Sequence, residues 1–396
     1  MQLLFGNHVL DVERRELRRG PHLVPVEPQV FDLLVYFVCH RDRVVSKDEL
    51  ISEIWGGRIV SESAVTSRIN AARKAIGDSG QDQKLIRTAA RKGFRFIGDV
   101  IEKTAEVSDL NSAAAAVPLE QQVRFCLSPD GVRIAHAAVG SGPPLVRTGH
   151  WLTHLEYDWE SPIWSVFIDQ LAAEHRLIRY DARGNGLSDW DVPDISLDAF
   201  VRDLETVVDA NGLDRFPLLG MSQGAAVSIV YAVRHPERVR HLVILGGFAR
   251  GPRMRGSPDE VATSDAVLTL IRQGWGQENP AFRQLFTSLF IPGGTPEQIR
   301  WYNDLQRKTT SPENAYRMRA VIDRIDVADL LNQVRAPTLV LHCRDDARVP
   351  FDEGRRLAAG IAGARFVALD GRNHILVEGE PAWDRFFKEL HGFLAT

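Results

Sequence analysis

The stretch that decides the fold of most of this chain is Phe216–Ala226, which reads FPLLGMSQGAA. Its apolar first half is typical of a buried strand, and the following segment, 227–233, has helical character, so Gly-x-Ser-x-Gly would form a sharp turn between a strand and a helix. Ser222 would adopt a strained conformation at this turn. Gly220 and Gly224 leave space for the crowded chain around it because they carry no Cβ. The sequence therefore predicts a serine hydroxyl presented at the end of a strand.

Candidate partners for this serine follow two later strands. From residue 121 onward strands and helices alternate, which predicts a mostly parallel sheet with functional side chains after the strand ends. Asp345 and Asp346 follow an apolar strand at 337–341, and His374 follows the last predicted strand. An imidazole can remove the serine proton and a carboxylate can orient the imidazole. Ser222, His374 and one of the two acids are therefore the candidate catalytic residues.

Residues 121–396 resemble the α/β-hydrolases of the esterase, lactonase and carbon–carbon hydrolase type. The motifs that carry the resemblance are Gly220–Gly224, the turn Asp181–Asp189, and Asp346 with His374. The resemblance implies a doubly wound sheet, a structural role for the Asp181–Asp189 turn, and Asp346 as the acid, because the acid of this family is followed by x-x-Val-Pro. A serine at the nucleophile position argues against epoxide hydrolases and dehalogenases, which use a carboxylate.

Two backbone N–H groups would stabilise the negative charge that develops on a substrate carbonyl oxygen. That of Gln223 directly follows the serine, and the resemblance places the second at Trp151, after a strand at 145–147. From about 250 to 334 helical segments interrupt the alternation, which predicts a helical cap over Ser222. Because the cap is rich in apolar and aromatic residues, we expect a small, mostly apolar ligand.

The first hundred residues follow a different pattern, in which short strands precede three helices. The third helix places Val65, Ile69, Ala72 and Ile76 on one apolar stripe, and the segment 83–98 contains five basic residues and no acid. Polar and cationic side chains outside the stripe and in this basic segment are of the kind that contact base edges and phosphates. The candidate DNA-binding residues are Ser63, Thr66, Ser67, Asn70, Arg73, Lys74, Arg87, Arg91 and Lys92.

Residues 1–101 resemble the winged-helix DNA-binding domain of OmpR/PhoB-type response regulators. The resemblance implies a four-stranded N-terminal platform, a recognition helix over roughly 62–76, a wing at 91–93 and pairing of two copies on DNA. The residues that carry the resemblance are Ser46–Leu50, Ile54–Trp55, Ser63–Ile69, Ala72–Asp78, Ile86–Thr88 and Lys92–Phe96.

The chain thus reads as an α+β winged helix-turn-helix domain at 1–101, a linker at 102–120 and an α/β-hydrolase domain at 121–396. The linker is rich in Ala, Ser and acidic residues and lacks apolar periodicity. Residues 1–103 contain 17 Lys and Arg against 14 Asp and Glu, whereas the rest contain 31 against 38. A basic module beside an acidic one favours double-stranded DNA as a partner of the first domain.

The composition argues against several other classes of protein. With 396 residues, 44% of them hydrophobic, the chain can build two globular cores. Its three cysteines are scattered without the spacing of a disulfide framework or a zinc site, and it has neither a signal pattern nor an apolar run of membrane-spanning length. We expect a cytoplasmic protein without a metal, a cofactor or a membrane partner.

Three functions from different classes fit these patterns. The first is a homodimeric transcriptional regulator whose hydrolase domain senses a small ester, lactone or similar ligand, with or without hydrolysing it. The second is a serine hydrolase with an accessory DNA-binding domain. The third is a protein–protein adaptor that uses neither site.

Overall fold

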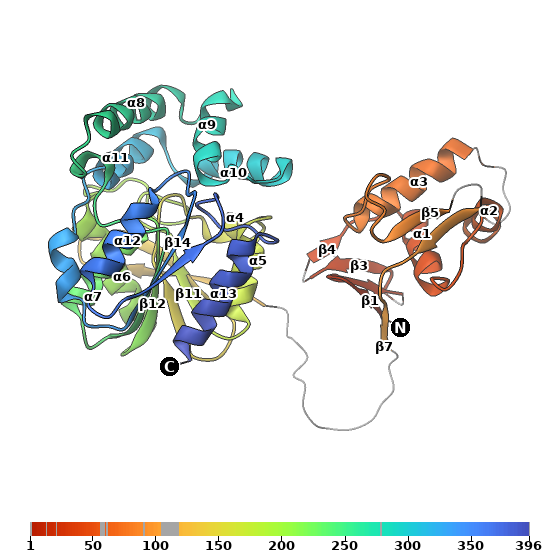
Figure 1. Cartoon of the computed structure of the whole chain (residues 1–396), viewed down its shortest axis with the longest axis horizontal. Coiled ribbons are helices and arrows are strands. Elements are labelled where there is room, and N and C mark those ends of the chain that lie inside the picture. Colours follow the sequence, from red (N-terminus) through yellow and green to blue (C-terminus); the bar gives the residue numbers. More distant parts are fainter. Residues whose placement is uncertain are drawn as a thin grey trace. The chain divides into compact units, whose positions relative to one another are not determined.

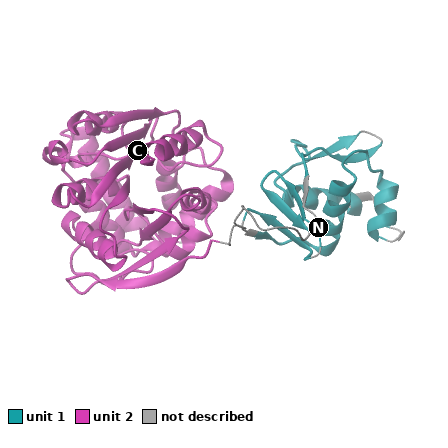
Figure 2. Ribbon diagram, turned by 90° about the horizontal axis from the view of Figure 1, so that it is seen from below, with its two compact units in different colours: residues 1–118 teal, residues 119–396 magenta. Residues whose placement is uncertain are grey.

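The computed structural model describes residues 2–12, 14–20, 22–55, 60, 62–89, 92–103, 119–277 and 279–395. The chain divides into two compact units, Met1–Pro118 and Leu119–Thr396, which Figure 2 colours separately. Each unit has its own hydrophobic core. The predicted linker falls mostly on 104–118, outside the described residues.

The first unit combines an antiparallel sheet with strand order β4-β3-β2-β1-β7, three helices and a separate two-stranded hairpin (Figure 1). The strands of the sheet are β1 (Gln2–Phe5), β2 (His8–Asp11), β3 (Glu16–Arg19), β4 (His22–Val24) and β7 (Ile101–Lys103). The helices are α1 (Pro28–Cys39), α2 (Lys47–Trp55) and α3 (Glu62–Ala75), and the hairpin joins β5 (Ile86–Ala89) to β6 (Gly93–Phe96).

The sheet of this unit contains a strand that the predicted four-stranded platform lacks. β7 pairs antiparallel with β1, with Leu4 opposite Ile101 and Gln2 opposite Lys103. A domain end at residue 101 therefore cuts a strand that continues to Lys103. The local sequence could not indicate this strand, because three residues carry almost no periodicity and their partners lie at the opposite end of the unit.

Helix α3 has the apolar stripe that the sequence predicts. Val65, Ile69, Ala72 and Ile76 are all at most 2% exposed and belong to the core of the first unit. Gly77 follows with a φ of +68°, a conformation that favours glycine and ends the helix. The face of α3 opposite this stripe is thereby held outward by packing.

The second unit contains an eight-stranded sheet of order β15-β14-β13-β12-β10-β11-β9-β8. Neighbouring strands run parallel from β15 to β11, whereas β9 pairs antiparallel with both β11 and β8. The strands are β8 (Gln122–Leu127), β9 (Arg133–Val139), β10 (Pro144–Arg147), β11 (Arg176–Tyr180), β12 (Phe216–Met221), β13 (Val239–Leu245), β14 (Thr338–Cys343) and β15 (Arg365–Leu369). This is the mostly parallel sheet that the alternation of segments predicts.

Strand order positions the site. The chain passes from β10 to β11 on one side and then returns to place β12 on the other side of β10. Such a switch point leaves a crevice at the carboxyl ends of the two central strands, because the connections leave in opposite directions. Ser222 follows β12 and Trp151 follows β10, so both residues lie at this crevice.

The helices of the second unit pack around this sheet, and four of them form the predicted cap (Figure 1). Each cap helix begins with Pro directly after a capping side chain, that of Ser257, Asn279, Thr295 or Ser311. Among the described residues, no helix has both the length and the apolar character needed to cross a membrane. The cap helices are α8 (Pro258–Gly274), α9 (Pro280–Phe290), α10 (Pro296–Thr309) and α11 (Pro312–Ile322). The others are α4 (Leu155–Trp159), α5 (Trp164–Ala172), α6 (Leu197–Ala210), α7 (Gly224–Arg234), α12 (Phe351–Gly360), α13 (Pro381–Leu394) and the 3₁₀ turns η1 (Pro252–Met254) and η2 (Ala328–Gln333).

Candidate active site and DNA interface

Ser222 sits at a strained turn between β12 and α7. Its φ is +53°, in the left-handed region that residues other than glycine rarely adopt. A Cβ on Gly220 would lie 2.5 Å from Ser228 Oγ, and a Cβ on Gly224 would lie 2.8 Å from Thr148 Oγ1. Only glycine therefore fits at both positions, and the turn presents the Ser222 side chain to the crevice.

Asp346 and His374 form a buried pair. His374 Nδ1 lies 2.8 Å from Asp346 Oδ2, and both side chains are at most 3% exposed. The other carboxylate oxygen of Asp346 accepts the backbone N–H groups of Arg348 at 2.8 Å and Val349 at 2.9 Å. Asp345, the rival acid, is exposed, so the structure brings Asp346 rather than Asp345 to the imidazole.

The second ring nitrogen of His374 is left open. Nε2 is buried and has no hydrogen-bond partner among the described residues. Because a carboxylate only accepts, Nδ1 donates to Asp346, and in the neutral form of the ring the lone pair that a general base needs lies on Nε2. Ser222 and His374 line the same narrow cavity together with Tyr302 and Phe290.

A second histidine, which the sequence did not indicate, supports the acid. His342, at the end of β14, places Nε2 3.1 Å from the Val349 carbonyl oxygen and 3.6 Å from Asp346 Oδ2. Burial lowers its pKa, so the ring is neutral and Nε2 donates to the carbonyl oxygen. His342 thereby helps to hold the loop that carries Asp346, and its place four residues before the acid is the only signal in the sequence.

The loop after β10 carries the predicted second oxyanion donor. Trp151 and Gln223 both line the cavity next to Ser222. Leu152 is 1% exposed with a φ of +59°, so this loop, like the serine turn, holds a side chain in a conformation that favours glycine. His150 Nδ1 lies 2.9 Å from the Trp151 carbonyl oxygen. This bond orients the Trp151–Leu152 peptide.

His150 is neutral in the folded protein. Burial, assisted by the positive charge of Arg147, lowers the pKa of His150 to about 3. Its Nδ1 must carry the proton, because the Trp151 carbonyl oxygen can only accept.

A cavity of about 200 Å³ opens onto Ser222 beneath the cap. Phe286 and Phe290 of α9 contribute rings to its wall, as the predicted apolar cap requires. Leu285 of the same helix instead points outward and is 44% exposed. The wall also contains charged residues that the sequence analysis missed, namely Arg255, Glu260, Arg319 and Arg348.

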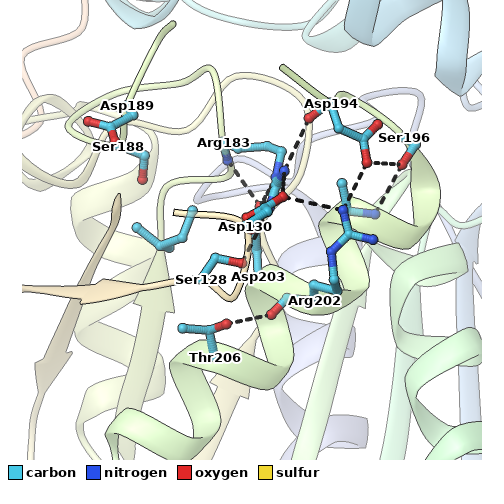
Figure 3. A network of polar contacts seen from close by, with 12 residues as sticks. Ser128, Asp130, Arg183, Ser188, Asp189, Asp194, Ser196, Arg202, Asp203 and Thr206 are labelled. Atoms are coloured by element: carbon cyan, nitrogen blue, oxygen red, sulfur yellow. Dashed lines mark hydrogen bonds and ion pairs between the residues drawn. The ribbon is translucent and has the colours of Figure 1, made fainter. Parts of the chain in front are cut away.

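The turn Asp181–Asp189 lies outside the Ser222 cavity and forms a network of ion pairs. Arg183 is buried and donates to the carboxylates of Asp203 and Asp130, as Figure 3 shows. Burial opposes its charge, but these two partners raise the pKa of Arg183, and Arg183 in turn holds the pKa of Asp130 well below its usual range. The turn does not line the cavity at Ser222, which agrees with the structural role expected for it.

The exposed face of α3 carries four of the nine predicted DNA-contacting residues. Thr66, Ser67, Asn70 and Lys74 are exposed along this helix, and Arg87 and Lys92 are exposed on the hairpin and its turn. The side chain of Ser63 and the whole of Arg91 lie outside the described residues. The face therefore keeps a mixed polar and cationic character.

Arg73 was predicted to contact DNA, but the structure places its side chain inside the first unit. Its side chain is 5% exposed, and its Nη2 donates to the Ile86 carbonyl oxygen at 2.8 Å and to Thr88 Oγ1 at 2.9 Å. Its guanidinium also lies over the Phe94 ring at 5.9 Å. Because residue 73 is four positions after Ile69, it lies beside the apolar stripe and joins α3 to the hairpin.

A buried acid holds the segment between α3 and the hairpin. The Asp78 carboxylate accepts backbone N–H groups from Ser79, Lys84, Leu85 and Ile86 at 2.8–3.0 Å. Burial works to raise its pKa, but these four bonds together lower it. The hairpin that bears Arg87 is therefore anchored to α3 through a fixed charge.

Among the residues described, no group of His, Cys, Asp and Glu is arranged to hold a metal ion.

Two family models match the two units of the chain. Residues 153–381 match the family described as alpha/beta hydrolase fold, and residues 22–96 match the family described as transcriptional regulatory protein, C terminal. Among solved structures, an esterase (EaEST) from Exiguobacterium antarcticum superposes with a TM-score of 0.58 at 22% identity, covering 69% of this chain and 99% of the esterase. That likeness shows the fold.

Sequence relatives cover the two units separately. A pimeloyl-(acyl-carrier protein) methyl ester esterase of Nitrosomonas europaea is 26% identical over 239 residues, which cover 59% of this chain and 90% of that esterase. The transcriptional activator CadC of Escherichia coli is 30% identical over 125 residues, which cover 31% of this chain and 24% of CadC. The chain therefore joins a DNA-binding regulatory domain to a hydrolase domain.

Proposed function

Because the chain belongs to the alpha/beta hydrolase fold family over more than half of its length and joins that fold to a DNA-binding regulatory domain, we propose that it is a ligand-sensing transcriptional regulator. Its ligand is a small, mostly apolar ester or lactone that binds beneath the cap and is hydrolysed at Ser222. The observation that carries this proposal is the cavity of about 200 Å³ that opens onto a strained serine next to a buried Asp–His pair.

The chemistry follows from the geometry of the pair. His374 Nε2 accepts the proton of Ser222 as Oγ attacks the ligand carbonyl carbon, and Asp346 stabilises the imidazolium that forms. The backbone N–H groups of Gln223 and Trp151 stabilise the oxyanion. The imidazolium then protonates the leaving oxygen, and water, deprotonated by the same ring, releases the acid and restores Ser222.

The cap offers a physical link between the ligand and the rest of the domain. The backbone N–H groups of His374 and Ile375 donate to the carbonyl oxygen of Phe290, the last residue of α9, at 2.9 and 3.1 Å. A ligand that moves α9 therefore acts on the same contact that holds the base. We propose that this movement changes how a homodimer presents its two DNA-binding domains, and hence its affinity for DNA.

The rival function is a serine hydrolase with an accessory DNA-binding domain. The open Nε2 of His374 favours it, because a pure receptor needs no general base. The two functions differ in one property. In the regulator, occupation of Ser222 changes DNA affinity, whereas in the accessory arrangement it does not.

A fluorophosphonate tests both steps on the full-length protein. It should add a single adduct at Ser222, detected by intact mass, and Ser222→Ala protein should add none. Absence of an adduct on the folded wild type would contradict an activated serine. The second step compares the adduct with untreated protein in binding to duplex DNA selected from a random pool. A change in affinity supports the regulator, and equal affinity with active turnover supports the accessory arrangement.

A further inference from the structure

The cavity above Ser222 contains more charge than an apolar ligand needs. Its wall includes three arginines and one glutamate. Arg255 is paired with Glu260 at 2.8 Å, and Arg319 is paired with Asp323 at 2.7 Å. For Arg348, in contrast, no carboxylate of the described residues lies within ion-pair distance of the guanidinium. One positive charge on the wall is thus left uncompensated.

Arg348 is held in place next to the catalytic pair. Its backbone N–H donates to Asp346, whose other oxygen binds His374. Its guanidinium lies over the Phe290 ring at 5.9 Å, and that ring meets His374 edge to face at 5.6 Å. A side chain that is half-buried and held against a ring has already lost much of its freedom, so binding a ligand costs it less entropy.

A second donor on the same wall lacks an acceptor. Arg319 is 7% exposed, and its Nε is buried with no hydrogen-bond partner in the part of the chain that the structure describes. Because Arg319 also lines the cavity, its guanidinium is placed to donate to a ligand oxygen there. The two arginines come from different segments, α11 and the loop after β14, and meet at one cavity.

We propose that the cavity accepts an ester or lactone whose acyl part carries a carboxylate, bound by the guanidinium of Arg348 with Arg319 as a further donor. A planar guanidinium binds the two oxygens of a carboxylate side by side, which matches an arginine that has no carboxylate partner among the described residues. A phosphate dianion would leave one of its charges uncompensated there. The proposal rests on the proposed reaction at Ser222, and its test separates the two.

The test compares two esters that differ only at the far end, mono(4-nitrophenyl) adipate and its methyl ester. Wild type should hydrolyse the carboxylate-ended ester with a kcat/KM at least about tenfold higher. Arg348→Gln should lower this preference by about 10- to 100-fold, and Arg348→Lys should lower it less because the charge remains. Arg344→Gln is the matched control: Arg344 lies on the same loop, bonds Asp370 and is not part of the cavity wall, so the preference should persist.

Two results would overturn the proposal: equal kcat/KM for both esters in the wild type, or an equal loss for both in Arg348→Gln. If the wild type hydrolyses neither ester, the proposed reaction fails and binding decides the ligand class. Calorimetry on Ser222→Ala protein would then compare monomethyl adipate with dimethyl adipate. Tighter binding of the monoacid that disappears in Ser222→Ala/Arg348→Gln supports the carboxylate site, and equal or undetectable binding of both overturns it.

Discussion

Two acidic turns of the hydrolase unit look alike in sequence, but the arginines of the two turns differ in how many partners they have. The turn Asp181–Asp189 follows β11, and the loop that begins with Asp346 follows β14, so both stand at carboxyl ends of parallel strands. In the first, Arg183 donates through all three of its guanidinium nitrogens to protein acceptors. In the second, the Arg348 guanidinium has no carboxylate partner among the described residues, and Asp346 binds His374, whose Nε2 also has no hydrogen-bond partner there.

This difference indicates how to distinguish polar residues that stabilise the fold from polar residues that can bind a ligand. A buried polar group whose partners are complete stabilises the fold and has nothing left for a ligand. A buried polar group that keeps one unsatisfied atom costs stability, and such atoms are expected where a substrate supplies the missing partner. Substitutions in the two turns should therefore affect different measurements.

The largest expected effect is on catalysis, at Asp346. Asp346→Asn should lower kcat for an activated ester by about 10²- to 10⁴-fold, because the amide no longer stabilises the imidazolium and can hold the wrong tautomer. The stability of the fold should change little by comparison. Asp345→Asn is the control, since this exposed neighbour lies outside the pair. A loss of kcat in Asp345→Asn alone would show that the acid had been wrongly chosen.

At Arg183 we expect the opposite of Asp346, namely a large loss of stability. Arg183→Met leaves Asp203 buried without a cation, which should cost about 3–5 kcal/mol in free energy of unfolding. The control is Arg202→Met in the same network (Figure 3): Arg202 is partly exposed, and its ion pairs with Asp130 and Asp194 should contribute about 1 kcal/mol or less. Chemical denaturation followed by tryptophan fluorescence measures both. A larger loss in Arg202→Met would reverse the assignment.

Much of the hydrolase site could be predicted because it depends on local backbone geometry. The Gly-x-Ser-x-Gly turn leaves room at residues 220 and 224 whatever surrounds it, and the order of Ser222, Asp346 and His374 follows the order of the strands. The apolar stripe of α3 could likewise be read, because its 3.6-residue period is local.

The features that the sequence did not predict depend mostly on contacts between distant segments. Arg319 and Arg348 meet at one cavity only after α11 folds over the sheet, and nothing in either local sequence indicates a shared wall. The pairing of β7 with β1 joins the two ends of its unit. The inward side chain of Arg73 could have been found, since it is four residues after Ile69, but its polarity favoured the opposite face.

A smaller effect, on stability, is expected from pH through His150. Its pKa in the folded protein is lowered to about 3, so its contribution to stability is complete above about pH 6.5 and is lost as the pH falls below that value. His150→Gln, which keeps an N–H donor for the Trp151 carbonyl oxygen, should remove about 1 kcal/mol of the stability lost between pH 6.5 and 5.5.

Tryptophan fluorescence is a suitable probe for that change. Seven of the eight tryptophans lie in the hydrolase unit, and Trp55 alone lies in the first unit. His136→Gln serves as a comparison, because its pKa is also lowered, first by burial, but it lies on β9 away from the Ser222 cavity. Identical acid sensitivity in the wild type and His150→Gln would contradict a neutral, buried His150.

The smallest expected effect extends the comparison to the DNA-binding unit, where Arg73 and Lys74 are neighbours on α3. Lys74 is exposed, so Lys74→Ala should lower the slope of log affinity against log salt by about 1, as for one lost phosphate contact. Arg73 spends its donors on Ile86 and Thr88, so Arg73→Met should destabilise the hairpin instead. Fluorescence anisotropy with labelled duplex DNA between 50 and 200 mM salt, together with thermal unfolding, separates the two. Suppose instead that folded Arg73→Met protein shows the flatter slope and Lys74→Ala does not. Internal hydrogen bonds would then not identify a structural arginine in this unit, and the conclusion from the two acidic turns would hold only for the hydrolase domain.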